Sequence, residues 1–206
     1  MNNNRLPVIG ATLAGGQGYR MNGEDKGLIM LNERPLYQHV LHSLQRQVDC
    51  IVINANRNLD RYRESGLPVI ADTLPNYPGP LAGILAVLSK VKAHWVVFAP
   101  CDTPWLPDNW VMQLWQQKNS APAVWLKSAE RNHPTLVMIN IEIKQRLYDF
   151  LNSGGRNLMK FLVESGGHAV QLDDQECHFS NINTPEDLAK ASICPPHCNP
   201  HDTLCA

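Results

Sequence analysis

The segment Pro7-Val-Ile-Gly-Ala-Thr-Leu-Ala-Gly-Gly-Gln-Gly18 decides the fold class of this chain. Its first part, residues 7–13, is apolar and partly β-branched, which predicts a buried strand. This strand leads directly into the glycines at positions 15, 16 and 18, and glycine is the residue that a tight turn accommodates best. A buried strand that ends in a glycine turn is typical of the first unit of an open α/β sheet.

Strands and helices alternate through the rest of the first half. Strands are expected at residues 50–55, 68–71 and 94–99, and helices at 35–47, 80–92 and 108–118. These strands are apolar throughout instead of alternating between apolar and polar residues. That pattern predicts a mainly parallel sheet that is covered by helices on both faces.

The second half is less regular. Strands are expected at residues 123–126, 135–139 and 168–172, with antiparallel pairing between the first two, and helices at 141–151 and 157–165. Thr184 followed by Pro185 predicts the start of a last helix. We therefore expect one domain over residues 1–193, with a mixed C-terminal half. Residues 194–206 are expected to form a flexible tail, although their three cysteines and two histidines leave metal binding open.

Composition excludes several classes of function. The 206 residues include 18 Lys and Arg against 19 Asp and Glu, so the net charge is -1. No general positive field attracts nucleic acid or an acidic membrane surface. The first residues predict no signal peptide, and no apolar run reaches about 20 residues, the length that a membrane helix needs. We therefore expect a cytoplasmic protein whose partners are neither nucleic acids nor membranes.

Polar residues follow the predicted strands where an open α/β sheet binds its ligands, outside the carboxyl ends. Arg20 follows the glycine turn, and the later strands lead to Asn54, Asp72 and Asp102. A glycine loop, a cation and carboxylates together indicate a nucleotide and a metal ion. The dinucleotide-binding pattern fails because Met21 stands at the third glycine position, and the P-loop fails because Gly27 follows Lys26.

Two cations and one carboxylate are the candidates for chemistry. Arg20 can bind phosphate oxygens in bidentate fashion, and Lys26 can neutralise oxygens that become more negative during reaction. Asp102 follows the most apolar strand, and Mg²⁺ commonly takes only one or two carboxylates together with substrate phosphates. Position alone leaves a second interpretation open for Asp102, a cap of the following turn.

Four motifs carry a resemblance to a known family. They are Leu13-Ala-Gly-Gly-x3-Arg20-Met-x3-Asp25-Lys-Gly-Leu28, Gly79-Pro-Leu-Ala-Gly-Ile84, Pro100-Cys-Asp-Thr-Pro104 and Asn181-Ile-Asn-Thr-Pro-Glu-Asp-Leu188. In this order they resemble the signature of the molybdenum cofactor guanylyltransferases, and the resemblance covers about residues 6–190. It implies a three-layer, Rossmann-like nucleotidyltransferase fold.

The resemblance also implies an activity and a set of site residues. The terminal phosphate of molybdenum-loaded molybdopterin attacks the α-phosphate of GTP, pyrophosphate leaves, and Mg²⁺ (or Mn²⁺ in its place) assists. Implied partners are the proteins of molybdenum cofactor biosynthesis and the acceptor molybdoenzymes. Implied catalytic residues are Arg20, Lys26 and Asp102, the last also as metal ligand. Implied nucleotide-binding residues are Leu13, Ala14, Gly15, Gly16, Lys26, Asn54, Asp72 and Asp102. Implied pterin-binding residues are Gly79, Gly83, Arg156, Asn181 and Asn183.

Two other functions stay open on the sequence. One is a cytidylyltransferase that acts on molybdopterin or on a sugar phosphate, because the glycine loop does not distinguish CTP from GTP. The other is a carrier that binds a nucleotide or cofactor without turnover. The motifs at 79–84 and 181–188 favour guanylyl transfer, and the joint presence of Arg20, Lys26 and Asp102 argues against a carrier.

Overall fold

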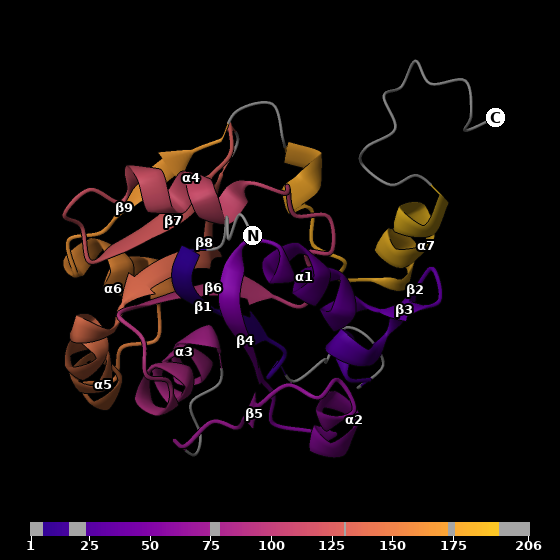
Figure 1. The fold of residues 1–206 in the computed structure, drawn as a ribbon, viewed down its shortest axis with the longest axis horizontal. Coiled ribbons are helices and arrows are strands. Elements are labelled where there is room, and N and C mark those ends of the chain that lie inside the picture. Colours follow the sequence, from indigo (N-terminus) through magenta and orange to yellow (C-terminus); the bar gives the residue numbers. More distant parts are fainter. Residues whose placement is uncertain (1–5, 17–23, 75–78, 130, 173–175, 194–206) are drawn as a thin grey trace.

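A seven-stranded sheet runs through the computed structural model, which describes residues 6–16, 24–74, 79–129, 131–172 and 176–193. Its strand order is β5-β4-β1-β6-β8-β7-β9 (Figure 1). Within the described residues, β8 is the one strand of this sheet that runs antiparallel to its neighbours. The predicted sheet, mainly parallel with a mixed C-terminal half, is confirmed. The strands are β1 (Leu6–Leu13), β4 (Val48–Asn54), β5 (Val69–Ile70), β6 (Trp95–Pro100), β7 (Ala123–Lys127), β8 (Asn132–Asn140) and β9 (His168–Gln171).

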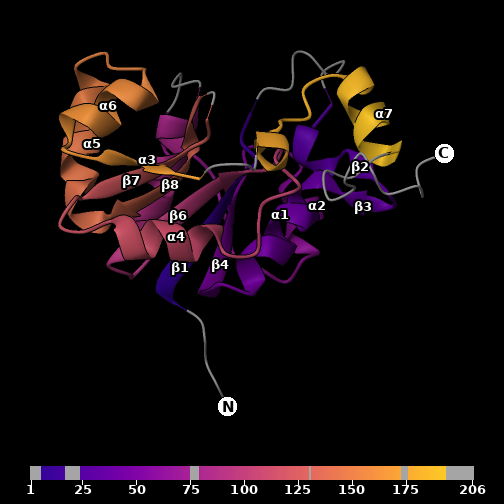
Figure 2. The ribbon, with the colours of Figure 1, turned by 90° about the horizontal axis from the view of Figure 1, so that it is seen from above.

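Helices cover both faces of this sheet and make the fold three layers deep (Figures 1 and 2). One apolar cluster joins the sheet to α1 (Leu36–Gln45), α2 (Leu59–Arg63) and α4 (Trp110–Gln117). A second cluster joins the other face to α3 (Pro80–Lys90), α5 (Lys144–Asn152) and α6 (Leu158–Glu164). Residues 81–88 of α3 are all buried, because this helix packs between the sheet and α5.

A small hairpin and the last helix form a separate apolar cluster at one side of the molecule (Figure 2). The hairpin consists of β2 (Met30–Leu31) and β3 (Arg34–Pro35), and both residues of its turn have positive φ, 48° at Asn32 and 63° at Glu33. Against it packs α7 (Pro185–Ile193), which begins at the predicted residue. This contact brings the chain around residue 183 close to the chain that follows the glycine turn.

The carboxyl ends of four parallel strands lie at the same level. Leu13 pairs with both Asn54 and Pro100, and Asn54 in turn pairs with Ile70. Residues that follow these strands therefore share one edge of the sheet, as the sequence predicted. In the part of the chain that the structure describes, no helix has the length and apolar character needed to cross a membrane.

Candidate active site

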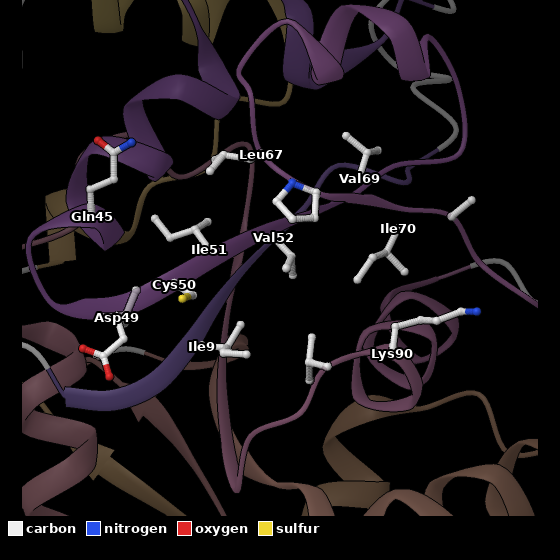
Figure 3. Close-up of a pocket in the computed structure, with 14 residues that line it drawn as sticks. Ile9, Gln45, Asp49, Cys50, Ile51, Val52, Leu67, Val69, Ile70 and Lys90 are labelled. Atoms are coloured by element: carbon white, nitrogen blue, oxygen red, sulfur yellow. The ribbon is translucent and has the colours of Figure 1, made fainter.

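Two large cavities lie along the parallel strands. The larger, about 800 Å³, lies beside β4 and β5 and is mostly aliphatic, with Asp49 and Lys90 among its few charged residues (Figure 3). The other, about 400 Å³, lies at the carboxyl ends of β1, β4 and β6. It combines the glycine loop with a lysine and two carboxylates, so it is the candidate active site. Its lining is Leu13, Ala14, Gly15, Gly16, Lys26, Asn54, Asp72, Gly79, Pro80, Pro100, Cys101, Asp102, Thr135 and Asn183.

Lys26 lies at the centre of this cavity. Its Nζ donates to Asp102 Oδ2 and to Asn183 Oδ1, both at 2.6 Å. The Lys26 and Asp102 side chains are only 18% and 15% exposed, so their charges attract each other more strongly than an ion pair in open solvent would. Three segments far apart in the sequence therefore meet at one ammonium group.

A buried carboxylate holds the backbone on which Lys26 sits. Asp25 accepts a hydrogen bond from Tyr62 Oη at 2.6 Å and another from Asn58 Nδ2 at 3.0 Å. Burial and the hydrogen bond to Asp25 raise the pKa of Tyr62 far above its usual value, so the phenol stays a donor. Gly27 lies against the same phenol, where a Cβ would come within 2.3 Å of Tyr62 Oη. Lys26 thus enters the cavity from a turn that is held by a buried hydrogen bond and by close packing.

Amide and carboxylate groups form the opposite side of the cavity. Asn54 Nδ2 donates to Asp72 Oδ1 at 2.8 Å and to the Ile70 carbonyl at 3.0 Å. Asn56 Nδ2 donates to Asp72 Oδ2 at 2.9 Å, and Asn56 Oδ1 accepts from the Asp72 backbone N–H at 2.8 Å. Both oxygens of Asp72 therefore have amide donors, and the group is held at the mouth of the cavity as an acceptor.

Gly83 of α3 makes this arrangement possible. A Cβ at position 83 would lie 2.2 Å from Asn54 Oδ1, closer than any real Cβ contact. Asn54 is 2% exposed, so its carboxamide cannot swing out into solvent without breaking its bonds to Asp72 and Ile70. Gly83 supports Asn54 from behind and is not among the described residues that line the cavity.

Gly83→Ala is expected to weaken nucleotide binding about 10-fold, because the added methyl group displaces the Asn54 carboxamide and its hydrogen bond to Asp72. Isothermal titration of GTP into the two proteins measures the change. Gly154→Ala is not a suitable control, since Gly154 has a φ of 90°. Ala86→Gly, also in α3, tests whether a general loss of helix stability is enough to weaken GTP binding. Unchanged GTP affinity in Gly83→Ala would contradict the role given to Asn54.

The glycine loop is fixed at both of its described ends. Ala14 N–H donates to the Asn54 carbonyl at 2.8 Å, and Arg57 donates to the carbonyls of Gly16 at 3.3 Å and Glu24 at 3.4 Å. Arg57 thus joins the two residues that flank residues 17–23. Arg20, a predicted catalytic residue, lies outside the described residues.

Cys101 lines the cavity beside Asp102 but is not a nucleophile. Burial raises the pKa of its thiol strongly, and the neighbouring Asp102 charge raises it further. A thiol of this kind stays protonated at neutral pH, and the thiolate is the reactive form. We therefore expect no acid–base role for Cys101.

The start of α7 holds Asn183 in place. Asp187 Oδ2 accepts from the backbone N–H groups of Asn183 at 2.9 Å and Thr184 at 3.0 Å, while Thr184 Oγ1 accepts from Asp187 N–H at 3.1 Å. The hydrogen bond from the Asn183 N–H holds the pKa of the Asp187 carboxyl below its usual value. This capping arrangement fixes the residue that receives a hydrogen bond from Lys26.

The contribution of Asp187 to stability is expected to depend on pH. The pKa of Asp187 is lower in the folded state than in the unfolded state. Its carboxylate therefore makes its full contribution to stability above the unfolded-state pKa of about 4, and this contribution is lost as the pH falls through the folded-state pKa. Asp187→Ala should cost about 1 kcal/mol at pH 7. Urea unfolding at pH 7 and pH 3 measures the difference in unfolding free energy between the wild type and Asp187→Ala. A difference that stayed constant down to pH 3 would contradict the proposed pH dependence.

Comparison with known proteins agrees with this geometry. Residues 10–169 match the MobA-like NTP transferase domain. A molybdenum cofactor guanylyltransferase of Serratia proteamaculans is 47% identical over 183 residues, which cover 89% of this chain and 93% of that protein. One of Yersinia pestis is 48% identical over 180 residues, 87% of this chain and 92% of that protein. The chain belongs to the molybdenum cofactor guanylyltransferase family.

Solved structures share the fold of this guanylyltransferase family member. Molybdopterin-guanine dinucleotide biosynthesis protein A from Archaeoglobus fulgidus has a TM-score of 0.72 and 25% identity, over 89% of this chain and 96% of that one. A 4-diphosphocytidyl-2C-methyl-D-erythritol synthase from Anaerococcus prevotii has a TM-score of 0.69 at 12% identity, over 92% of this chain and 96% of that one, and shows the fold alone. The predicted nucleotidyltransferase fold is confirmed.

Most of the predicted site residues of this guanylyltransferase family member lie together. The predicted nucleotide-binding residues all line the cavity, as do Gly79 and Asn183. Asn181 lies next to it, where its Oδ1 accepts from Thr103 Oγ1 at 3.1 Å. Among the described lining residues neither Gly83 nor Arg156 is present. Arg156 donates to the carbonyls of Leu151 and Gly155, so its assignment to the pterin stays a prediction.

Thr135, Asn56 and Arg57 were missed by the sequence analysis. Asn56 and Arg57 have no motif around them in the sequence. Thr135 was missed because β8 is antiparallel, so the start of this strand, and not its end, meets the carboxyl edge of the sheet. A polar residue at the beginning of an antiparallel strand is the signal that could have identified it.

Proposed function

We propose that this protein transfers GMP from GTP to the terminal phosphate of molybdopterin or its molybdenum-loaded form, and releases pyrophosphate. The observation that carries this is the identity of 47–48% to molybdenum cofactor guanylyltransferases over almost the whole chain. The cavity supports it, because it offers a glycine loop, a central lysine and a carboxylate at one sheet edge. We further propose that residues 1–193 act as one nucleotidyltransferase domain and that 194–206 are a tail.

The donor set fits a Mg²⁺ ion held by Asp102. Asp102 Oδ2 accepts a hydrogen bond from Lys26 Nζ, and Oδ1 accepts a longer one from Thr103 Oγ1 at 3.4 Å, which leaves Oδ1 room for a cation. The oxygens of Asp72 are both engaged by asparagine amides. Among the described residues no group of three or more His, Cys, Asp or Glu side chains could hold a metal ion. Mg²⁺ commonly takes one or two carboxylates and completes its coordination with phosphate oxygens.

Chemistry at this site needs no protein nucleophile. An oxygen of the acceptor phosphate attacks the α-phosphorus of GTP, the new P–O bond forms, and the bond to pyrophosphate breaks with its electron pair on the leaving oxygen. A bound Mg²⁺ would supply neutralisation of phosphate charge. Backbone N–H groups of the glycine loop bind phosphate oxygens, and Lys26, released from Asp102, neutralises charge that develops in the transition state. Positioning and charge account for the rate in transfers of this kind.

Pyrophosphate release tests the proposal directly. The purified protein with Mg²⁺ is incubated with each of the four nucleoside triphosphates, with and without molybdenum-loaded molybdopterin. Release that requires both GTP and the pterin is the expected result. Release with CTP instead would keep the mechanism and change the base. Binding of GTP without release, when the pterin is present, would favour a carrier and contradict the proposed function.

A further inference from the structure

Strand β8 carries an irregularity next to the candidate active site. On β7 the neighbours Trp125 and Leu126 pair with Val137 and His133 of β8, so Pro134, Thr135 and Leu136 are additional residues on one strand. Such bulges redirect side chains and are frequent beside active sites. Proline, which has no N–H for the ladder, is expected at this kind of position.

The same irregularity opens the sheet beside Asp102. The pairing of β6 with β8 ends at Phe98 and Val137, so the last two residues of β6 lie beyond the ladder that the two strands share. Thr135 occupies this region and lines the cavity together with Pro100 and Asp102. It is half-buried, and its hydroxyl can donate one hydrogen bond and accept others.

The base of the bulge is anchored inside the protein. His133 is 7% exposed, and its Nε2 lies 2.9 Å from Oγ of Ser128, which is 1% exposed. The His133 ring also packs against the buried ring of Phe179, with 4.8 Å between the ring centroids and a tilt of 41°. Breaking a buried hydrogen bond leaves a polar group without its partner and costs stability. The Ser128–His133 bond therefore fixes the position of His133, two residues before Thr135.

The position of Thr135 in the sheet indicates which substrate it meets. The glycine loop, Asn54 and Asp72 follow β1, β4 and β5, whereas Thr135 belongs to β8, on the other side of β6 and Asp102. Nucleotide and acceptor must approach the α-phosphate from different sides, because the acceptor oxygen attacks opposite the leaving pyrophosphate. The side of the cavity beyond Asp102 is therefore the acceptor side.

We propose that the Thr135 hydroxyl hydrogen-bonds the phosphate-bearing acceptor, and that the buried Ser128–His133 hydrogen bond is the positioning element that holds Thr135 there. This rests on the proposed function for the identity of the acceptor. It adds a substrate-contacting residue and two positioning residues to the site.

Binding measured without turnover separates this proposal from the proposed function. Fluorescence titration gives the affinity for molybdopterin, and a fluorescent GTP analogue gives the affinity for nucleotide. Thr135→Val keeps the shape and removes the hydroxyl, so the Kd for molybdopterin should rise about 3- to 10-fold while the Kd for nucleotide stays constant. Thr135→Ser should restore the wild-type value. Thermal unfolding followed by circular dichroism verifies that each variant is folded.

Ser128→Ala distinguishes positioning from general support of the fold. If Ser128 acts through Thr135, Ser128→Ala raises the molybdopterin Kd, and the double variant with Thr135→Val binds no more weakly than Thr135→Val alone. If the effects of Ser128→Ala and Thr135→Val on the molybdopterin Kd multiply in the double variant, Ser128 has only a structural role and the positioning claim is overturned. Asn132→Ala is the matched control: it removes the hydrogen bond from Trp125 at the same strand end and should leave both Kd values unchanged.

Two other results have clear meanings. Equal molybdopterin affinity in wild type and Thr135→Val would overturn the contact and leave the proposed function intact. A wild-type protein that binds nucleotide but no molybdopterin would overturn the proposed function. A change in the nucleotide Kd in Thr135→Val would overturn the assignment of Thr135 to the acceptor side.

Discussion

Lys26→Met is expected to lower kcat for nucleotide transfer about 10²- to 10³-fold, the usual effect of removing one preorganised group that stabilises transition-state charge. Asp102→Asn should lose at least as much, because it removes the carboxylate proposed to hold Mg²⁺. The pyrophosphate assay with saturating GTP and acceptor measures both. In either variant the KM for GTP should change much less than kcat, since the glycine loop and the Asn54–Asp72 pair remain.

Matched controls exist close by. Asp108 lies six positions after Asp102 and is exposed in an ion pair with Arg46, and Lys90 is exposed at the other end of the sheet. Asp108→Asn and Lys90→Met should both transfer nucleotide at the wild-type rate. Wild-type kcat in both Lys26→Met and Asp102→Asn would show that the site has been placed wrongly.

The ion pair adds a test of stability that is independent of activity. Lys26 and Asp102 are more than 80% buried, so Lys26→Met leaves a carboxylate without its charge partner and should cost about 2 kcal/mol of unfolding free energy. Adding Asp102→Asn removes that charge. The double variant should therefore be more stable than Lys26→Met while remaining inactive, and urea unfolding measures the difference.

The parallel half of the fold was predictable because its strands are largely apolar runs that lead into polar or glycine residues. For the same reason the position of Asn54, Asp72 and Asp102 at one edge followed from the sequence, since parallel strands all present their carboxyl ends to one side. The motif at 181–188 predicted both the start of α7 and the presence of Asn183 at the site.

Other features were not predictable, for physical reasons that differ. Two-residue strands such as β2 and β3 have no periodicity, and Glu33 is an unusual residue at positive φ. The position of Thr135 at the cavity depends on a bulge in an antiparallel strand, and no local sequence pattern predicts that bulge. The role of Gly83 depends on contact with a side chain 29 positions earlier in the sequence, Asn54, and only the packed structure reveals that distance.

Gly27→Ala is expected to destabilise the protein by about 2–4 kcal/mol, because overpacking of a rigid core costs free energy and a hydrogen bond is lost with it. The new Cβ would lie 2.3 Å from Tyr62 Oη and 3.3 Å from the Cβ of Ala14. Tyr62 is fully buried between the sheet and α2, so its ring cannot move aside. The hydrogen bond from Tyr62 to Asp25 should break, and kcat should fall as Lys26 shifts.

Tyr62→Phe is the second variant of this test. Its effect on the unfolding free energy should change sign when Gly27 is replaced by alanine. In the wild-type background it removes a 2.6 Å hydrogen bond to a buried carboxylate and should cost about 1.5–3 kcal/mol. In the Gly27→Ala background it removes the oxygen that collides with the new methyl group, leaving the nearest ring carbon at 3.2 Å. There it should raise the unfolding free energy. Tyr148→Phe, on an exposed ring, should do neither.

Urea unfolding of the four proteins in this cycle measures the coupling, and transfer kinetics measure whether Lys26 follows. If the turn at 25–28 positions Lys26, kcat should remain low in the double variant even though its stability recovers, because Asp25 has still lost its phenol donor. Recovery of both stability and kcat would mean that Lys26 finds its place without the Tyr62–Asp25 bond. Additive losses of stability would mean that the close contact between Gly27 and Tyr62 is relieved by movement of the turn, and the proposed rigidity of that turn would be wrong.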